Sequence, residues 1–276
     1  MRDRKLFMRK ILAAAVGVVA LVVLAVCRNG GDGQLTLEKI SYDKSKENPV
    51  VYIKENGEYV PYLVLTSDYG GNVLLLRENV LPEEMPYKTS SHGEGGGALS
   101  AGWTYYDYGS YYEESSIDDY LNTSFLDIFS PEIQAAIVDT TIEVTDRESY
   151  SEQSWANATH MIERKIFLLS AVEYGVNFSV GYNITKEGKS LDYFKKLDYF
   201  EKVAYKEDGT AWSYWTRTPW IWNSCDVTVI GVTKLGFAQA DKLLGVRPAF
   251  CMGKNTIIQE NDNIVAGKSV YIIKQD

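Results

Sequence analysis

The sequence predicts a mixed α+β fold in which a twisted antiparallel sheet is combined with short helices. Short runs rich in Val, Leu, Ile and Tyr occur at both ends of the chain and are separated by glycine-containing turns, which is typical of strands. Between them lie segments with helix-capping residues followed by apolar residues at helical spacing. No period of about 20–50 residues repeats, so a solenoid or propeller is not expected.

The opening of the chain has the pattern of a membrane-targeting segment. Five basic residues stand within Met1–Lys10, and an unbroken apolar run follows over Ile11–Cys27. A basic flank before an apolar run predicts insertion with the basic end in the cytoplasm. The rest of the chain is therefore expected on the outer face of the cytoplasmic membrane, with the membrane contacted through the N-terminus.

Cleavage of this segment stays open at the level of sequence. The stretch "LAVC", which ends at Cys27, resembles a bacterial lipobox and implies a lipoprotein anchored at Cys27, but Val26 stands where that motif has a small residue. The apolar run of 17 residues is at the short limit for a spanning helix. A cleaved lipoprotein signal peptide, an uncleaved anchor and a secreted form are the alternatives. Residues 28–48 are predicted to be a polar tether.

The strand pattern begins at Pro49, and we expect one domain over residues 49–276. Asn56-Gly57 and the Gly70–Asn72 turn separate three apolar runs, which predicts a meander over residues 50–54, 58–66 and 72–78. Four more strands are predicted near the C-terminus, over residues 213–219, 227–232, 243–252 and 269–274.

Short helices are predicted in the middle of the chain. Ser116 and Ser130 stand where N-caps are expected, and Pro131 occupies a first helical position. Ser170 and Glu173 have the spacing of a capping box, which predicts another short helix. Residues 191–200 predict an amphipathic helix with three apolar side chains facing inward, namely Leu191, Phe194 and Leu197.

The charge of the chain is unevenly distributed. The net charge is −9, and residues 104–148 hold eleven acids against one base, which leaves the remainder almost neutral. Phosphate backbones would be repelled by such a segment, so no nucleic acid partner is expected.

The chain contains few residues able to form a catalytic or metal-binding motif. His92 and His160 are the two histidines, and neither stands in a zinc-binding motif. Cys225 and Cys251 either form a disulfide or are buried thiols, and a pairing of one of them with His160 is a remote catalytic option. No metal and no cofactor are expected, and no catalytic residue is assigned.

Aromatic residues gather around Pro219. Trp215, Arg217 and Arg247 are expected to be structural, with the guanidinium groups lying against indole faces and donating to backbone carbonyls. The residues after the proline are expected on a loop, where their side chains face outward. Together with a glycine-rich tyrosine segment they form the predicted recognition surface, which consists of Trp220, Trp222, Asn223, Asp226, Tyr105, Tyr106 and Tyr108. Tyr111 and Tyr112 continue that segment and are also expected outside the core.

Four motifs in this order resemble a family of bacterial extracytoplasmic domains of unknown function, and the resemblance covers about residues 50–252. They are Leu121-Asn122, Leu168–Ser170, Trp215–Pro219 and Gly245–Ala249. The last two motifs also resemble the C-type-lectin-like fold of formylglycine-generating enzymes and of variable binding proteins. That resemblance implies a display region over residues 220–244.

The known activities of that fold are not expected here. Trp222-Asn223 is followed by Ser224 rather than the acidic residue of calcium-dependent lectins, and Cys225 and Cys251 are too far apart for the copper site of formylglycine-generating enzymes. The leading hypothesis is a membrane-tethered, non-catalytic binding domain for a cell-surface protein or glycan. The alternatives are a structural or accessory domain of an envelope assembly and an enzyme of unrecognised chemistry.

Overall fold

A three-stranded meander opens the largest sheet. It consists of β1 (Val50–Glu55), β2 (Glu58–Tyr69) and β3 (Asn72–Arg77). The computed structural model describes residues 33–89, 110–146, 158–176, 186–220 and 226–274. Asn56 and Gly57 turn the chain at positive φ angles of 48° and 90°, conformations that Asn and Gly tolerate best. The predicted meander is confirmed, and β2 continues three residues further than expected.

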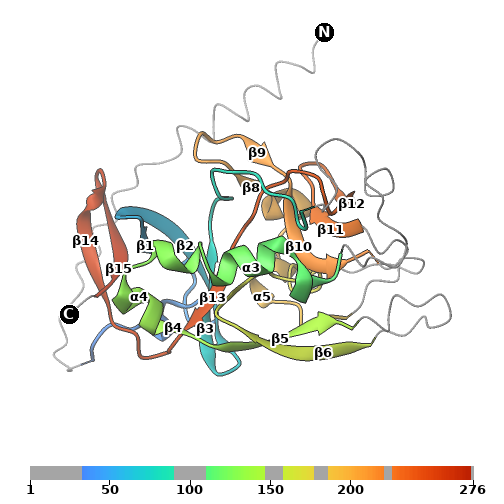
Figure 1. Cartoon of the computed structure of the whole chain (residues 1–276). Helices are drawn as coiled ribbons and strands as arrows, with labels where there is room; N and C mark the ends of the chain where they lie inside the picture. Colours follow the sequence, from blue (N-terminus) through green and yellow to red (C-terminus); the bar gives the residue numbers. More distant parts are fainter. Residues whose placement is uncertain (1–32, 90–109, 147–157, 177–185, 221–225, 275–276) are drawn as a thin grey trace, which may run out of the picture. The chain divides into compact units, whose positions relative to one another are not determined.

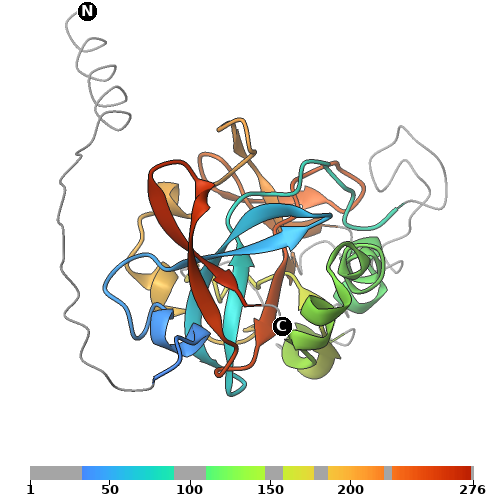
Figure 2. The ribbon, with the colours of Figure 1, turned by 90° about the vertical axis from the view of Figure 1, so that its left-hand side faces the viewer.

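The meander belongs to a sheet of eight strands among the described residues. Seven follow the order β14-β15-β1-β2-β3-β13-β4, and β7 also pairs with β13. The pairing of β1 with β15 is parallel and the others are antiparallel. The added strands are β4 (Ile137–Val138), β7 (Ile166–Phe167), β13 (Ala249–Met252), β14 (Ile258–Val265) and β15 (Lys268–Ile273). Figure 2 faces the β14–β15 hairpin and shows how strongly the sheet curls.

Three smaller sheets complete the strand content of the described residues. One has the order β10-β11-β12, and two are hairpins, β5–β6 and β8–β9. Figure 1 shows β11 and β12 on the opposite side of the folded unit from β14 and β15. The strands are β5 (Thr140–Thr145), β6 (Thr159–Arg164), β8 (Ala204–Tyr205), β9 (Ala211–Trp212), β10 (Tyr214–Pro219), β11 (Asp226–Ile230) and β12 (Leu235–Gln239).

The helices are short, which confirms the mixed α+β class. Ser130 caps the helix that begins at Pro131, as predicted. The cap of the preceding helix is Ser115 rather than Ser116, because the Ser115 hydroxyl accepts the Asp118 N–H at 3.0 Å while Ser116 bonds to Thr89. The helical segments are α2 (Leu37–Ile40), η1 (Tyr112–Glu114), α3 (Ser116–Asn122), η2 (Leu126–Ile128), α4 (Pro131–Ala136), α5 (Asp192–Lys195) and η4 (Tyr199–Lys202).

The helix predicted over residues 191–200 is divided into α5 and η4. Asp198 starts the second segment through a capping box, in which its own N–H donates to Glu201 Oε2 at 2.7 Å. This local cap competes with continuation of the first helix. Leu191 and Phe194 are buried as expected, so the apolar pattern is satisfied without a continuous helix.

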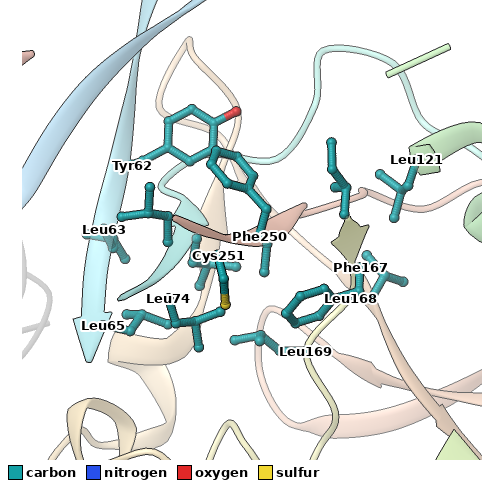
Figure 3. Close-up of a cluster of buried hydrophobic side chains, with 14 of the residues drawn as sticks. Tyr62, Leu63, Leu65, Leu74, Leu121, Phe167, Leu168, Leu169, Phe250 and Cys251 are labelled. Atoms are coloured by element: carbon teal, nitrogen blue, oxygen red, sulfur yellow. The ribbon is translucent and has the colours of Figure 1, made fainter. Parts of the chain in front are cut away.

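The core forms where β13 meets β2, β3 and β7. All four residues of β13 are buried, and Figure 3 shows Phe250 and Cys251 among leucines from the meander and the Phe167–Leu169 stretch. Phe250 packs against Tyr62 at a ring distance of 5.2 Å and against Phe129 at 5.7 Å. The strand β13, which begins at the last residue of the Gly245–Ala249 motif, thus lies at the centre of the fold.

The folded unit begins before residue 49. Leu37 and Ile40 of α2 are buried, Leu37 N–H donates to the Thr256 carbonyl at 3.0 Å, and Tyr42 N–H donates to the Val64 carbonyl at 3.1 Å. Residues 35–276 form one compact unit. The segment from 35 to 48, which was expected to be part of a tether, therefore belongs to the fold.

Deleting residues 1–33 is expected to leave a cooperatively folding protein, whereas deleting residues 1–48 is expected to lower the free energy of unfolding by about 2 kcal/mol. The longer deletion removes the fully buried Leu37, and the released chain entropy offsets part of that loss. Chemical denaturation of the two deletion variants measures the difference. Equal stability of the two would show that α2 does not support the fold.

The membrane segment expected at the N-terminus, including Cys27, lies outside the described residues. Within the ranges that the structure describes, no helix is both long and apolar enough to span a bilayer.

Candidate functional site

Arg217 of β10 is the centre of a buried polar network. Its side chain is completely buried and pairs with both oxygens of Glu173, at 2.7 and 3.0 Å. The same guanidinium donates to the carbonyls of Leu168 at 2.9 Å and Glu143 at 3.0 Å. Arg217 therefore joins β10 to β5 and to the segment that follows β7.

Glu173 lies in a turn where a helix was predicted. The reciprocal bonds of the expected capping box are present, since Ser170 N–H donates to Glu173 Oε2 at 2.8 Å and Glu173 N–H donates to Ser170 Oγ at 3.1 Å. Gly175 follows at a φ of 68°, and residues 171–175 form turns rather than a helix. The prediction of a helix is wrong here, because the left-handed glycine ends the segment after one turn.

The carboxylate of Glu173 is saturated with hydrogen bonds. Tyr69 donates to Oε1 at 2.6 Å, in addition to the two bonds from Arg217 and the bond from the Ser170 N–H. A carboxylate offers about four acceptor positions, and all are used. Glu173 is therefore a structural anion and is poorly suited to act as a general base.

Glu187 is a second buried carboxylate beside Arg217. Thr145 donates to Oε1 through its N–H at 2.8 Å and its hydroxyl at 2.6 Å, and Thr218 donates to Oε2 at 2.6 Å. Burial raises the pKa of Glu187 to about 7, although Arg217 and the hydrogen bonds from the two threonines oppose the rise.

Gly188 is required by the close approach of the chain to Glu173. Its φ is 75°, and a Cβ atom at this position would lie 2.7 Å from Glu173 Oε1. Gly188→Ala is expected to lower the free energy of unfolding by about 2 kcal/mol, because the left-handed strain adds to a collision with a side chain held by Arg217. Gly209→Ala is the control, since its φ is 83° and no atom lies within 4 Å of the added Cβ.

Chemical denaturation of both glycine variants separates the two contributions. Gly209→Ala is expected to show the backbone strain alone, about 1 kcal/mol. Equal losses in the two variants would mean that Glu173 moves aside freely, contrary to its fixed position in the network.

Arg247 and Trp215 are also buried. The Arg247 Nε donates to the Arg77 carbonyl at 2.8 Å, and its guanidinium carbon lies 5.5 Å from the centre of the Tyr214 ring. The indole of Trp215 instead donates to the Met85 carbonyl at 2.9 Å. The guanidinium groups were predicted to lie against indoles, but the ring beneath Arg247 is that of Tyr214.

Trp220 and Phe237 form a stacked aromatic pair at the β10–β12 sheet. Their ring centres are 4.7 Å apart with an angle of 22° between the planes. Trp220 is half-buried, whereas 54% of Phe237 is exposed. The backbone N–H of Trp220 donates to the Asp226 carbonyl at 2.8 Å, and this bond fixes the chain directly after β10. We call these two residues the aromatic pair.

Other residues of the predicted recognition surface lie elsewhere or outside the described chain. Asp226 was expected to contact a ligand, but it is buried at the start of β11. Tyr111 and Tyr112 were expected outside the core and are buried, and the Tyr112 hydroxyl accepts the Leu168 N–H at 3.1 Å. The remaining predicted residues, which fall in segments that the structure does not describe, are Tyr105, Tyr106, Tyr108, Trp222 and Asn223.

The buried cysteine is poorly placed to act as a nucleophile. Cys251 is a free thiol in the core, and burial raises its pKa to about 12, so the reactive thiolate is not formed near neutral pH. His160 faces two carboxylates instead, with Nε2 3.0 Å from Glu113 Oε2 and Nδ1 3.3 Å from Asp146 Oδ2. Cys225 lies outside the described residues. A pairing of Cys251 with His160 is therefore not supported.

A cavity of about 690 Å³ opens beside the buried network. Glu143, Glu173 and Tyr69 form part of its wall. Three further acids line the cavity, namely Asp43, Asp68 and Asp192. Lys189 is a basic residue in the same wall. Within the described part of the chain, no three His, Cys, Asp or Glu side chains are grouped so as to hold a metal ion.

These features define a class of protein: a mixed α+β domain built around a buried arginine–glutamate network, with a partly exposed aromatic pair at one sheet. The match to a family model covers residues 70–254, and the family is described as Domain of unknown function (DUF6273). The chain belongs to this family. No curated protein and no solved structure is detectably similar to it. The helix α2, the strands β1 and β2, and the hairpin β14–β15 lie outside the matched residues.

Proposed function

We propose that this chain is a non-catalytic binding domain, tethered to the outer face of the bacterial cytoplasmic membrane, that recognises a protein or glycan ligand through the aromatic pair. The observation that carries the proposal is the exposure of Phe237 while its ring stacks on Trp220. The outer face of the Phe237 ring, supported from behind by Trp220, is a flat apolar surface, which suits the face of a sugar ring or an apolar side chain.

The position of the pair in the sequence supports the same function. Trp220 and Phe237 both fall within residues 220–244, the display region implied by a C-type-lectin-like fold, which we propose for this domain. Phe237 lies on β12, the end strand of the β10-β11-β12 sheet, so a ligand that approaches this end of the sheet would meet its exposed ring.

A structural or accessory domain is the second candidate. Asp226 was expected to contact a ligand, and Tyr111 and Tyr112 were expected outside the core. The burial of all three supports the view that residues of these segments build the core instead. In this alternative the aromatic pair contacts a fixed neighbour in an envelope assembly and binds no soluble ligand.

The test compares Phe237→Ala with Phe200→Ala in the full-length chain. Phe200 is a matched control, because it is an equally large aromatic side chain, is 66% exposed, and lies on η4, outside residues 220–244. The probes are an array of bacterial and host glycans and a panel of purified cell-surface proteins. Phe237→Ala is expected to weaken binding more than tenfold, because such aromatic anchors contribute about 2 kcal/mol or more.

Phe200→Ala is expected to bind as the unchanged chain does. Equal affinity of all three proteins for a bound probe would exclude the aromatic pair as the contact. Absence of binding to every probe would favour the accessory-domain alternative.

A further inference from the structure

Glu187 is a buried carboxylate that connects separate parts of the fold. Its oxygens accept from Thr145 at the end of β5 and from Thr218 in β10. Its backbone carbonyl accepts the Ser170 hydroxyl at 2.7 Å, in the turn that carries Glu173. A change in the charge of the Glu187 side chain therefore acts directly on both strands, while the backbone of Glu187 stays bonded to this turn.

The charge of Glu187 is incompletely balanced. Arg217 is the cation that faces it, and Arg217 already pairs with both oxygens of Glu173. Among the residues that the structure describes, the other charged or titratable groups around this segment are Glu143 of β5, which accepts the Gly188 N–H, Tyr69 of β2, and the exposed Lys186 and Lys189. A buried net negative charge is costly, so a proton is readily taken up.

Protonation changes the demand for hydrogen bonds. In the ionised state both threonine hydroxyls donate to Glu187, and the Thr218 hydroxyl at the same time accepts the Ala171 N–H at 2.9 Å. A protonated carboxyl is itself a donor, so one of the hydroxyls must turn to accept. Thr218 stands two residues before Trp220 in the chain.

We propose that Glu187 is a protonation switch that adjusts the end of β10 and thereby the position of Trp220. One consequence rests on the proposed function: if the aromatic pair binds a ligand, that binding would depend on pH. The switch itself concerns the folded chain without ligand, and its test needs none. Near-neutral titration of Glu187 is in keeping with the effect of its burial.

The experiment is a pH titration by NMR of the full-length chain, kept in mild detergent so that its apolar N-terminal run stays dispersed. Carbon-13 in the glutamate carboxyl groups reports the protonation of Glu187, and Glu187→Gln identifies its signal. The indole N–H signal of Trp220, identified with Trp220→Phe, reports the end of β10. We expect both signals to move with one midpoint near pH 7, and the Trp220 signal of Glu187→Gln to stay constant.

Thr145→Val provides a second variant should Glu187→Gln fail to fold. It removes one donor to the ionised carboxylate, so the midpoint is expected to rise. Glu163→Gln, an exposed substitution on β6, is expected to change neither signal. A Glu187 midpoint below about pH 5, within the ordinary range for glutamate, overturns the switch, and so does a Trp220 signal that ignores the titration. Neither of these two outcomes would change the effect of Phe237→Ala on ligand binding, so the switch and the proposed function can fail independently.

Discussion

Replacing Arg217 by methionine is expected to lower the free energy of unfolding by about 4 kcal/mol. The substitution keeps an unbranched side chain but removes the cation that faces Glu173 and Glu187 in the core. Two carboxylates would then share a dry site without compensation, and the carbonyls of Leu168 and Glu143 would lose their donors. Removing one partner of a buried pair is far more costly than the pair itself is worth.

Urea denaturation of Arg217→Met measures this loss, and Lys195→Met is the control. The Lys195–Asp192 pair has a comparable distance of 2.6 Å, but its side chains are 53% and 75% exposed. Exposed pairs contribute little, so the control is expected to change the unfolding free energy by less than about 1 kcal/mol. Similar losses in both variants would mean that water reaches Arg217 in the folded protein.

A double variant tests whether the cost arises from the unpaired charge. Glu173→Gln added to Arg217→Met removes one of the two uncompensated carboxylates. The double variant is therefore expected to lose less stability than the sum of the single changes. Additive losses would indicate that Arg217 acts mainly through its bonds to the backbone carbonyls.

The sequence predicts the meander well because its determinants are local. Asn56-Gly57 and Gly70-Gly71 favour turns whatever surrounds them, and the apolar run between them, rich in Val, Leu and Tyr, favours a strand. The caps at Ser130 and Pro131 are equally local. Such elements follow from residues that are close neighbours along the chain.

The buried network could not be predicted in the same way. Glu173 was recognised by its capping-box spacing to Ser170, but its main partner is Arg217, 44 residues away. Glu187 and Gly188 follow no motif, and their importance arises because the fold brings them against that ion pair. Contacts between distant segments decide these roles, and spacing in one sequence does not encode them.

The aromatic residues show the same limit in another form. Trp220 was predicted to face outward, and its stacking partner Phe237 was not singled out because the strand β12 was not foreseen. Tyr111 and Tyr112 lie in a stretch rich in glycine and serine, yet they are buried. Composition alone does not distinguish a tyrosine that binds a ligand from one that fills the core.

The stability of the domain is expected to fall by about 3 kcal/mol as the pH rises from about 5 to about 8. Burial raises the pKa of Glu187 from 4.5 to about 7 in the folded protein. Between these values the folded state holds a proton that the unfolded chain has released. The contribution of Glu187 is therefore complete below about pH 4.5 and is lost as the pH rises through about 7.

Other carboxylates act in the opposite direction at lower pH. The pKa values of Asp43 and Glu113 are lowered in the folded protein. Burial by itself would raise both, but the hydrogen bonds to each carboxylate have the larger combined effect. These bonds come from Ser41 and Ser67 to Asp43, and from Tyr111 and His160 to Glu113. Their stabilising contributions are lost as the pH falls below their ordinary values. Maximum stability is accordingly expected in mildly acidic solution.

Denaturation curves from pH 5 to pH 8, for the unchanged chain and for Glu187→Gln, test this expectation. The amide resembles the protonated acid and does not titrate, so its unfolding free energy should stay nearly constant over this range. The variant should match the unchanged chain near pH 5 and exceed its stability near pH 8. Glu163→Gln, on the exposed face of β6, should keep the full pH dependence. A flat profile for the unchanged chain would show that Glu187 stays ionised throughout, held by Arg217 and the two threonines more strongly than burial opposes it.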